Sequence, residues 1–531
     1  MSRLKTSPLA ALAVAGAVGA FAASGPAAAK TLRIGAQADA GTMDPHAQNI
    51  QTTISVLSWM HEALVTRDKS LAKAPQLATG WENLSPTEWR FTLRPDVKFH
   101  DGSAFGADDV AMSIARAQSD TSQYKGYVGN IAQTRIVDDL TIELVTAEPD
   151  PLLLDKLTQV FIMDKDWADT NNVQRPQDLK QKEETYSVQN ANGTGPYMLK
   201  VREPDARTVL TRNPDYWGTL DGDIDEIVFQ PISEGPTRIA ALVSGELDLV
   251  TAIPSQNVAQ LEASPDVKLE VTDEFRTLFF AFDVGSESLK HGDAGGKNPF
   301  SDRRVRQAVN LALDSEAIVR TVMRGYATPT GQILAPGNVG YDAELDALSG
   351  YDPEAAKGLL AEAGYADGFS FTLDCPNNRY INDEQICRAA AAMLAQVGLD
   401  VSLNLMPRAV YFGQRLWNRD STMFLMGFNS PYFDGTYMAE TMVMTTTEGS
   451  EGIYNYSLNS DLELDAAIRD ARGTLDVEGR HKKLQAVYRT IKGDVLYAPL
   501  HHQVLVYAMK PNVGVKIRPD NWLEIRWVTM D

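Results

Sequence analysis

Cysteine is scarce in this chain of 531 residues: the only two, Cys375 and Cys387, lie in the segment DCPNNRYINDEQIC. Their spacing is not Cys-x-x-Cys and no histidine lies between them, which disfavours a redox or metal-binding pair. Catalytic motifs are missing as well, because His61-Glu62 is not followed by the second histidine of HExxH and no GxSxG segment occurs. The sequence therefore contains neither a zinc-peptidase motif nor the nucleophile elbow of a serine hydrolase.

Basic residues are also in short supply. Lys and Arg number 49 against 70 Asp and Glu, which gives a formal net charge of −21 at pH 7. They are scattered rather than clustered, and an acidic chain repels phosphate backbones, so we expect no nucleic acid among the partners. With 44% hydrophobic and 22% charged residues, the composition is typical of a globular protein rather than a disordered or fibrous one.

The apolar run near the N-terminus is short. It covers residues 9–23, follows Arg3 and Lys5, and precedes three small residues at 27–29. A run of about 15 residues is shorter than the roughly 20 that span a bilayer. We therefore predict that residues 1–29 are a cleaved secretory signal peptide. No cysteine stands near the cleavage site, so we expect a soluble periplasmic protein rather than a lipoprotein.

Export determines how the two cysteines are interpreted. In an oxidising compartment, a single close pair of cysteines forms a disulfide. We therefore predict a Cys375–Cys387 bridge. It closes a short loop, so loop-closure entropy limits its stabilising effect to roughly 3 kcal/mol.

Strand and helix patterns alternate along the chain. The second half has helices that stop at Gly364 and Gly398 and one that begins at Asp352-Pro353, with apolar strands between them. The alternation predicts an α/β fold with a second lobe over about 280–495. The strands expected are 30–36, 89–93, 96–99, the hairpin TRIVDDLTIELVT, EIVFQPI, 369–374, 401–406, 422–428, 496–511 and 522–528, and the helices of the first half are 54–65, 107–117 and TRIAALVS.

Several segments together resemble a known family. They are LATGWENLSPTEWRFTLRPDVKFHDGSAFGADDV, GTGPYMLK, RNPDYWG, LVSGELDLV, PFSDRRVRQAVNLALD and PLHHQVLVYAMKP, and they are spread in order over nearly all of 30–531. They resemble segments of the bacterial family 5 extracellular solute-binding proteins, the dipeptide, oligopeptide and nickel type that serve ABC importers.

The resemblance implies a two-lobed periplasmic binding protein of the class II, cluster C type, with discontinuous lobes and an extra inserted subdomain. Lobe I would comprise 30–75, 185–278 and 499–531, the subdomain 76–184, and lobe II 279–498. The implied function is to capture a peptide or peptide-like solute and deliver it to a membrane permease, as a monomer without a cofactor or metal. Nickel chelates, haem, opines and oligosaccharides remain alternative ligands, because the fold is shared and the pocket is not.

The segment MFLMGFNSPYFDGTYM is the main candidate for the binding site. Its aromatic and polar residues form the mixture that lines small-molecule pockets, although a surface turn is an equally good interpretation of the residues alone. In peptide-binding members, an acidic residue of this loop pairs with the α-amino group of the peptide. Here Asp434 is the one acidic residue, and Ser430-Pro431 stand where a second would fall. The candidates are Phe428, Asn429, Tyr432, Asp434 and Tyr437.

Other candidates are weaker. Asp39, Thr42 and His46 follow the first strand, a position where ligands bind in open α/β sheets. Arg379 and Arg408 could hold a carboxylate through paired N–H donors, but for each a surface ion pair is the favoured interpretation, and Arg379 could pair with Asp374 or Asp383.

Two histidine segments have structural and functional interpretations. His100-Asp101 could be a base and its orienting carboxylate in an exported hydrolase, or a turn between a strand and a helix. His501-His502 lies in a predicted strand, where neighbouring side chains point to opposite faces, and a shared metal is therefore disfavoured.

Overall fold

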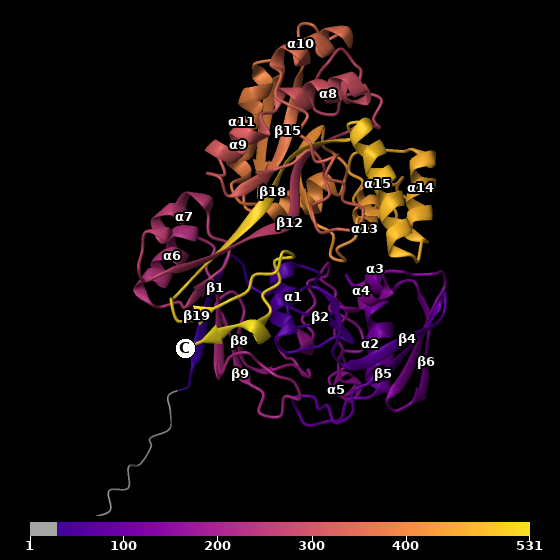
Figure 1. Ribbon diagram of the computed structural model, residues 1–531, viewed down its shortest axis with the longest axis vertical. Helices are drawn as coiled ribbons and strands as arrows, with labels where there is room; N and C mark the ends of the chain where they lie inside the picture. The colour runs from indigo at the N-terminus through magenta and orange to yellow at the C-terminus, as the bar shows by residue number, and fades with distance from the viewer. Residues whose placement is uncertain (1–28) are drawn as a thin grey trace, which may run out of the picture.

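Two long strands join the two lobes of the molecule. The computed structural model describes residues 29–531, and residues 1–28 of the predicted signal peptide lie outside them. Strands β12 (Lys268–Phe282) and β18 (Tyr497–Met509) run from the lower lobe to the upper lobe in Figure 1. No helix in the described part of the chain is both long and apolar enough to cross a membrane.

Lobe I, the lower lobe, is built around β1, which pairs in parallel with β10 on one side and β11 on the other. Helix α6 ends at Gly245, whose φ of +85° is the left-handed conformation expected for a helix stop. Its strands are β1 (Thr31–Ala36), β2 (Val65–Arg67), β3 (Lys73–Pro75), β8 (Tyr197–Glu203), β9 (Arg207–Arg212), β10 (Glu226–Pro231), β11 (Leu249–Val250), β19 (Val513–Gly514) and β20 (Thr529–Met530), and its helices are α1 (Gln51–Ser58), η1 (Tyr186–Val188), α6 (Gly235–Ser244), α7 (Ser255–Glu262) and η5 (Ile525–Trp527).

Lobe II, the upper lobe, contains three strands, β15, β16 and β17, that run parallel to one another. Asp352 caps helix α10 through a 2.9 Å bond from the Ala355 amide, as its position before Pro353 predicts. The strands are β13 (Gly292–Asp293), β14 (Ala327–Pro329), β15 (Ser370–Pro376), β16 (Asp400–Met406) and β17 (Met423–Phe428), and the helices are η2 (Pro299–Ser301), α8 (Arg303–Ala312), α9 (Ser315–Thr321), α10 (Pro353–Glu362), α11 (Asp383–Ala395), α12 (Arg408–Val410), η3 (Tyr411–Leu416), α13 (Thr436–Met438), η4 (Ala439–Val443), α14 (Leu462–Arg472) and α15 (Val477–Gly493).

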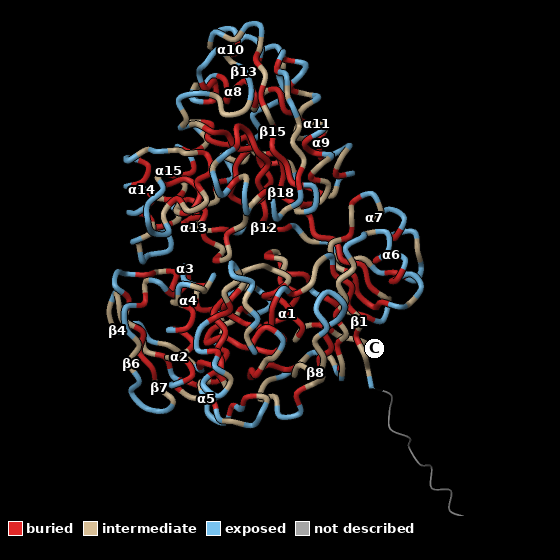
Figure 2. The backbone as a smooth tube through the Cα atoms, turned by 180° about the vertical axis from the view of Figure 1, so that it is seen from behind, coloured by how far each residue is buried: buried red, intermediate tan, exposed pale blue. Residues whose placement is uncertain are grey.

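One sheet runs through both lobes in the order β13-β15-β17-β12-β18-β11-β1-β10-β9-β8, with β14 beside β18 and β16 beside β15. Strand β12 alternates between two cores in lobe II: Leu278 and Phe280 face one, and Phe279 and Ala281 face the other. Figure 2 shows this buried interior in red, with exposed segments around it. The sheet therefore supplies the shared core of lobe II and the connection to lobe I.

The β12–β18 ladder is interrupted where the chain passes between the lobes. Pairing proceeds from Asp273 with Val504 to Thr277 with His502, so two additional residues bulge from β12. Bulges bend strands and redirect side chains. This irregularity is the natural place for the lobes to bend, and it lies within a few residues of the predicted lobe borders at 278/279 and 498/499, which stay predictions.

A separate four-stranded sheet, β4-β5-β7-β6, lies beside lobe I within residues 78–146. Helix α2 begins after Gly106, whose amide donates to the Asp109 carboxylate at 2.8 Å, as the acidic first turn predicts. The strands are β4 (Ala78–Ser85), β5 (Glu88–Leu93), β6 (Ile131–Asp138) and β7 (Thr141–Thr146), and the helices are α2 (Ala107–Ala117), α3 (Lys125–Val128), α4 (Leu153–Leu157) and α5 (Lys165–Thr170).

Three of the predicted elements differ in the structure. The helix expected over 54–65 covers Gln51–Ser58, and Val65 begins strand β2 instead. The strand expected over 96–99 is reduced to one bridge, between Lys98 and Ala104, because the chain turns at once into helix α2. The strand expected over 522–528 is irregular, and η5 occupies Ile525–Trp527. In these segments tertiary packing overrides local periodicity.

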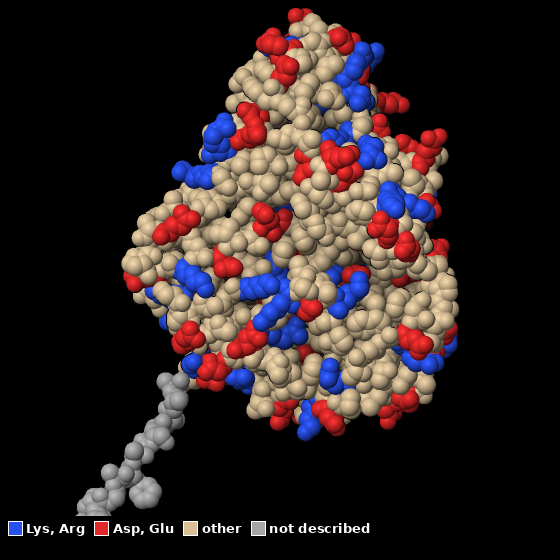
Figure 3. Space-filling view, in the orientation of Figure 1, with Lys and Arg blue, Asp and Glu red and all other residues tan. Residues whose placement is uncertain are grey.

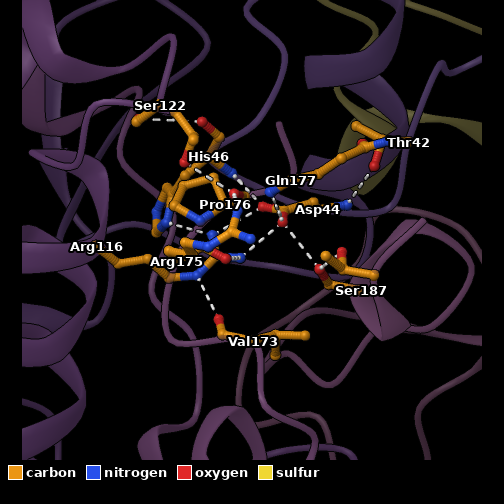
Figure 4. Close-up of polar contacts among 12 residues, drawn as sticks. Thr42, Asp44, His46, Arg116, Ser122, Val173, Arg175, Pro176, Gln177 and Ser187 are labelled. Carbon is orange, nitrogen blue, oxygen red and sulfur yellow. Dashed lines mark hydrogen bonds and ion pairs between the residues drawn. The ribbon is translucent and has the colours of Figure 1, made fainter. Parts of the chain in front are cut away.

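A fully buried ion pair joins the loop after β1 to the subdomain (Figure 4). Both carboxylate oxygens of Asp44 accept hydrogen bonds from Arg116, at 2.7 and 2.6 Å, and neither side chain is exposed to solvent. Asp44 also accepts from the Ser187 hydroxyl at 2.8 Å. Burial alone would raise the pKa of the Asp44 carboxyl, but the Arg116 guanidinium lowers that pKa to about 2. The pair therefore remains charged at every pH at which the protein is expected to function.

We predict that Arg116→Met lowers the free energy of unfolding by about 3–5 kcal/mol, because it leaves the Asp44 charge buried without its partner. Urea denaturation of the purified protein measures the change. The matched control is Arg135→Met, which removes a partly exposed arginine paired with Glu88 at 2.8 Å and should cost less than about 1 kcal/mol. Equal losses for the two variants would contradict a structural role for the Asp44–Arg116 pair.

Candidate functional site

The carboxyl ends of the parallel strands of lobe II meet at one edge of the sheet. After β15 comes the loop 377–382, after β16 the turn into α12, and after β17 the loop 429–435. Ligands of open α/β sheets bind at such an edge. The β17 loop reaches both lobe I and the subdomain, since the Tyr432 carbonyl accepts from Arg67 of lobe I at 3.4 Å and the Tyr432 ring packs against the Tyr127 ring of the subdomain with centroids 5.7 Å apart. This edge of lobe II therefore faces lobe I.

Three arginines gather at this edge. Arg379 comes from the loop after β15, Arg408 follows β16, and Arg276 comes from the bulge of β12. Arg276 donates to Glu274 at 3.0 Å. Within residues 29–531, no hydrogen bond or ion pair engages the guanidinium of Arg379 or of Arg408, and neither Asp374 nor Asp383 pairs with the Arg379 side chain. Their N–H groups are thus available to a ligand.

Arg379 is held in place by its own loop. The predicted Cys375–Cys387 disulfide is present and closes this loop against helix α11. The Arg379 amide donates to Asp383 at 2.8 Å, and its guanidinium lies 5.0 Å from the centroid of the Tyr380 ring. The disulfide and the Asp383 carboxylate therefore fix the backbone, while the charged end of Arg379 remains free.

The charge at this position is concentrated. Burial, together with the neighbouring charges of Arg276 and Arg408, lowers the pKa of the Arg379 guanidinium to about 10. The group is still charged at pH 7, so several positive charges share one partly desolvated place. Arginine holds carboxylates through paired N–H donors, and such a group of arginines suits an anionic ligand.

Aromatic side chains line the adjoining loop after β17. Phe428 stacks on Tyr437 with ring centroids 5.9 Å apart, and the Tyr432 and Tyr437 centroids lie 5.1 Å apart. Asn429 is half-buried, and its side chain makes no hydrogen bond to any described residue. The three aromatic candidates therefore lie together in the loop at the same edge of lobe II, and Asn429 follows Phe428 in the chain. Their contact with a ligand stays a prediction.

Asp434 lies in the same loop but has an internal partner. The side chain is 1% exposed, and its two oxygens accept from Arg480 at 2.9 Å and from the Thr436 amide at 2.9 Å. Arg480 is equally buried in helix α15. An amine anchored by Asp434 would have to replace these partners, so its ligand-binding role stays a prediction that the geometry does not favour.

The candidates after β1 also have internal partners, all in lobe I or the subdomain. Asp39 pairs with Arg202 at 2.8 Å, and the Thr42 hydroxyl accepts from the Asp44 amide at 3.1 Å. His46 bonds to the Phe161 carbonyl at 2.8 Å, and burial lowers its pKa to about 3. Figure 4 shows that Thr42 and His46 belong to the network around Asp44, whereas Asp39 has its own partner in Arg202. Their role in binding stays untested, and we leave them out of the proposed site.

The two histidine segments are held by structural contacts. The His100 ring bonds to the Gly195 carbonyl at 3.0 Å, whereas the Asp101 carboxylate accepts from Ser103 and Asn192 rather than from His100. The turn at His100-Asp101 thus attaches the subdomain to the GTGPY segment. His502 meets the Thr277 hydroxyl at 2.9 Å, and both it and His501 are buried on β18.

Comparison with known proteins identifies the family. Residues 73–450 match the family described as bacterial extracellular solute-binding proteins, family 5 Middle. The chain belongs to this family of solute-binding proteins, which serve ABC importers. The resemblance found in the sequence motifs is thereby confirmed.

Similar proteins with known ligands cover nearly the whole chain. The glutathione-binding protein GsiB of Salmonella paratyphi A is 26% identical over 520 residues, 96% of each chain. The periplasmic binding protein DppA of Helicobacter pylori, solved with the peptide STSA, has a TM-score of 0.80 at 22% identity and covers 94% of this chain and 98% of its own. AgaA of A. tumefaciens R10, solved with agropinic acid, has a TM-score of 0.78 at 22% identity, with coverages of 94% and 99%. These neighbours confirm the predicted α/β, two-lobed fold class.

We predict that Asp434→Asn lowers the free energy of unfolding of the solute-free protein by about 3 kcal/mol, because Arg480 would then be a buried charge without a counter-ion. Thermal and urea unfolding measure the loss. Asp470→Asn is the control, since Asp470 pairs with Lys483 at the surface, and it should change little. Unchanged stability together with weakened solute binding would instead assign Asp434 to the amine of the solute.

Proposed function

We propose that this protein is the periplasmic receptor of an ABC importer and captures a peptide-like solute that carries a carboxylate. Glutathione is the first candidate. The observation that carries the proposal is the group formed by Arg276, Arg379 and Arg408, two of which have unengaged guanidinium groups where the lobes meet. A carboxylate that accepts from Arg379 and Arg408 would satisfy those donors and offset their mutual repulsion.

The relatives support an acidic solute rather than a purely cationic one. Glutathione, peptides and agropinic acid, the ligands named for the proteins above, all carry carboxylates. The carboxylate at Asp434 is already paired with Arg480, and the resemblance implies that Ser430-Pro431 stand where peptide-binding members have a second acidic residue. Recognition through the acidic end of the solute therefore requires fewer existing contacts to be broken than recognition through its amine.

We place the hinge between the lobes at the bulge of β12, and bending there explains capture of the solute. A solute that touches both lobes gains all its contacts only when the lobes are closed, so binding shifts the open–closed equilibrium by the difference in affinity. The irregular pairing at Asp273–Thr277 allows that bending without separating the rest of β12 from β18.

We further propose that residues 1–29 direct export, that the mature protein is a monomer without a lipid anchor, and that its closed form docks on the permease. Figure 3 shows acidic and basic side chains interspersed over most of one face.

We predict that Arg379→Gln weakens the binding of glutathione by at least about tenfold, because one charge-assisted carboxylate contact is lost. Isothermal titration of the purified mature protein measures the dissociation constant. Arg388→Gln is the matched control: it removes an arginine from the adjoining helix α11 whose guanidinium pairs with Glu384 at 2.8 Å. It should leave the affinity unchanged.

A thermal-shift screen in parallel tests the class of solute. It includes glutathione, short peptides, opines, sugars, haem and nickel–histidine, and a bound solute raises the melting temperature by mass action. Stabilisation by neutral sugars or by nickel–histidine, with none by carboxylate-bearing peptides, would contradict the proposal.

For His100 we predict a structural effect alone. His100→Ala should lower the melting temperature, because it removes the ring's hydrogen bonds to the 193–195 segment, each of which contributes about 1 kcal/mol to stability. It should leave the affinity for glutathione within about twofold of the parent value, because these bonds lie away from the proposed site. Turnover of peptide or ester substrates by the parent protein, abolished in the variant, would favour a hydrolase instead.

A further inference from the structure

The tip of the loop after β17, Tyr432 and Phe433, is flanked on both sides by residues that are attached to lobe II. The Ser430 hydroxyl donates to the Asp434 carbonyl at 2.5 Å, and Asp434 is paired with Arg480. The Tyr488 hydroxyl donates to the Gly435 carbonyl at 2.7 Å, and Asp434 forms a bridge with Val339. Both ends of the tip therefore move with lobe II.

Tyr432, at the tip, packs into lobe I. Its side chain is 3% exposed and belongs to the hydrophobic cluster of lobe I and the subdomain, although it is attached to lobe II. Its ring meets the Tyr127 ring edge to face, and its carbonyl accepts from Arg67 at 3.4 Å. Rotation of the lobes away from each other would withdraw this ring from the cluster and expose it to water.

Phe433, the next residue, is held from lobe I as well. Its φ of +60° is an unfavourable conformation for a bulky residue, so surrounding contacts must maintain it. The Arg67 guanidinium lies 4.0 Å from the centroid of its ring, and the Phe275 ring lies 5.0 Å away on the β12 bulge. Arg67 is itself fixed by a 2.7 Å ion pair with Asp155 in the subdomain. The position of Arg67 is therefore fixed by a contact that does not involve the tip.

We propose that Tyr432 and Phe433 form a latch that holds the two lobes closed in the absence of solute, and that the latch sets how readily a solute enters and leaves. The inference rests on the proposed function, because it concerns the open–closed equilibrium of a solute-capturing clamp. In a clamp closed only by its solute, the contacts between the lobes come from the solute. Here the chain supplies an aromatic insertion and a cation–π contact of its own.

The test measures the lobes without any solute. Energy transfer between dyes at Asp138→Cys in the subdomain and Glu478→Cys in lobe II reports opening, and the native cysteines are engaged in their disulfide. Tyr432→Ala should lower the closed-to-open ratio by roughly tenfold, because the aromatic insertion is lost. Tyr432→Phe keeps the ring and should leave the ratio unchanged, since no hydrogen bond from the Tyr432 hydroxyl links it to a described residue.

A second variant tests the latch from lobe I, should Tyr432→Ala fail to fold. Arg67→Met removes the cation–π contact with Phe433 and should also open the lobes. The matched control is Arg94→Met, which removes a cation–π contact of similar length, 4.1 Å to Trp217, that joins the subdomain to lobe I and involves no residue of lobe II. Unchanged transfer efficiency in both Tyr432→Ala and Arg67→Met, or equal opening in Arg94→Met, would overturn the latch. A failure of glutathione to bind would affect only the proposed solute.

Discussion

The antiparallel pairing of β12 with β18 is the contact on which the two-lobed structure depends. Thr277 and His502 are 225 residues apart in sequence and adjacent in the ladder, so nearly all of lobe II is a loop closed by this pairing. On one side of the bulge the ladder belongs to lobe I, and on the other it carries β17 and the rest of lobe II. Because the bulge already lacks regular pairing, bending there sacrifices few hydrogen bonds.

The same topology determines where the residues of the candidate site lie. Parallel strands in both lobes end in loops, and the lobe II loops lie at the edge that faces lobe I. Arg379 reaches that edge on a loop closed by the only disulfide of the chain, and Arg276 reaches it because the bulge redirects the β12 backbone. The carboxylates nearby are engaged: Glu274 with Arg276 and Gln503, and Asp434 with Arg480. Uncompensated positive charge at the edge is therefore a product of the fold rather than of overall composition, which is acidic.

Local signals in the sequence predicted much of the fold and little of the site. Gly245 as a helix stop and Asp352 as a cap depend only on neighbouring residues, and both were predictable. The partner of Asp434 lies 46 residues away on helix α15, so the loop of Asp434 suggested a free carboxylate where the structure has a buried pair. Arg276 was missed because its position depends on a bulge that no local pattern indicates. The aromatic loop was found from residue types alone, whereas the insertion of Tyr432 into lobe I depends on how the lobes meet.

Closure of the lobes draws on two kinds of contact that respond differently to solute. In the proposed latch, the contacts of Tyr432 and Phe433 with lobe I and the subdomain involve no solute atom, so they favour closure without discriminating between solutes. The guanidiniums of Arg379 and Arg408 have the opposite effect: closing an empty site further desolvates neighbouring like charges that have no acceptor, and this penalises the empty closed state. A carboxylate removes that penalty, whereas a neutral solute of the same shape does not. In the proposed mechanism, the latch and the arginines therefore oppose each other in the empty protein, and specificity comes from relieving the electrostatic cost rather than from the number of contacts formed.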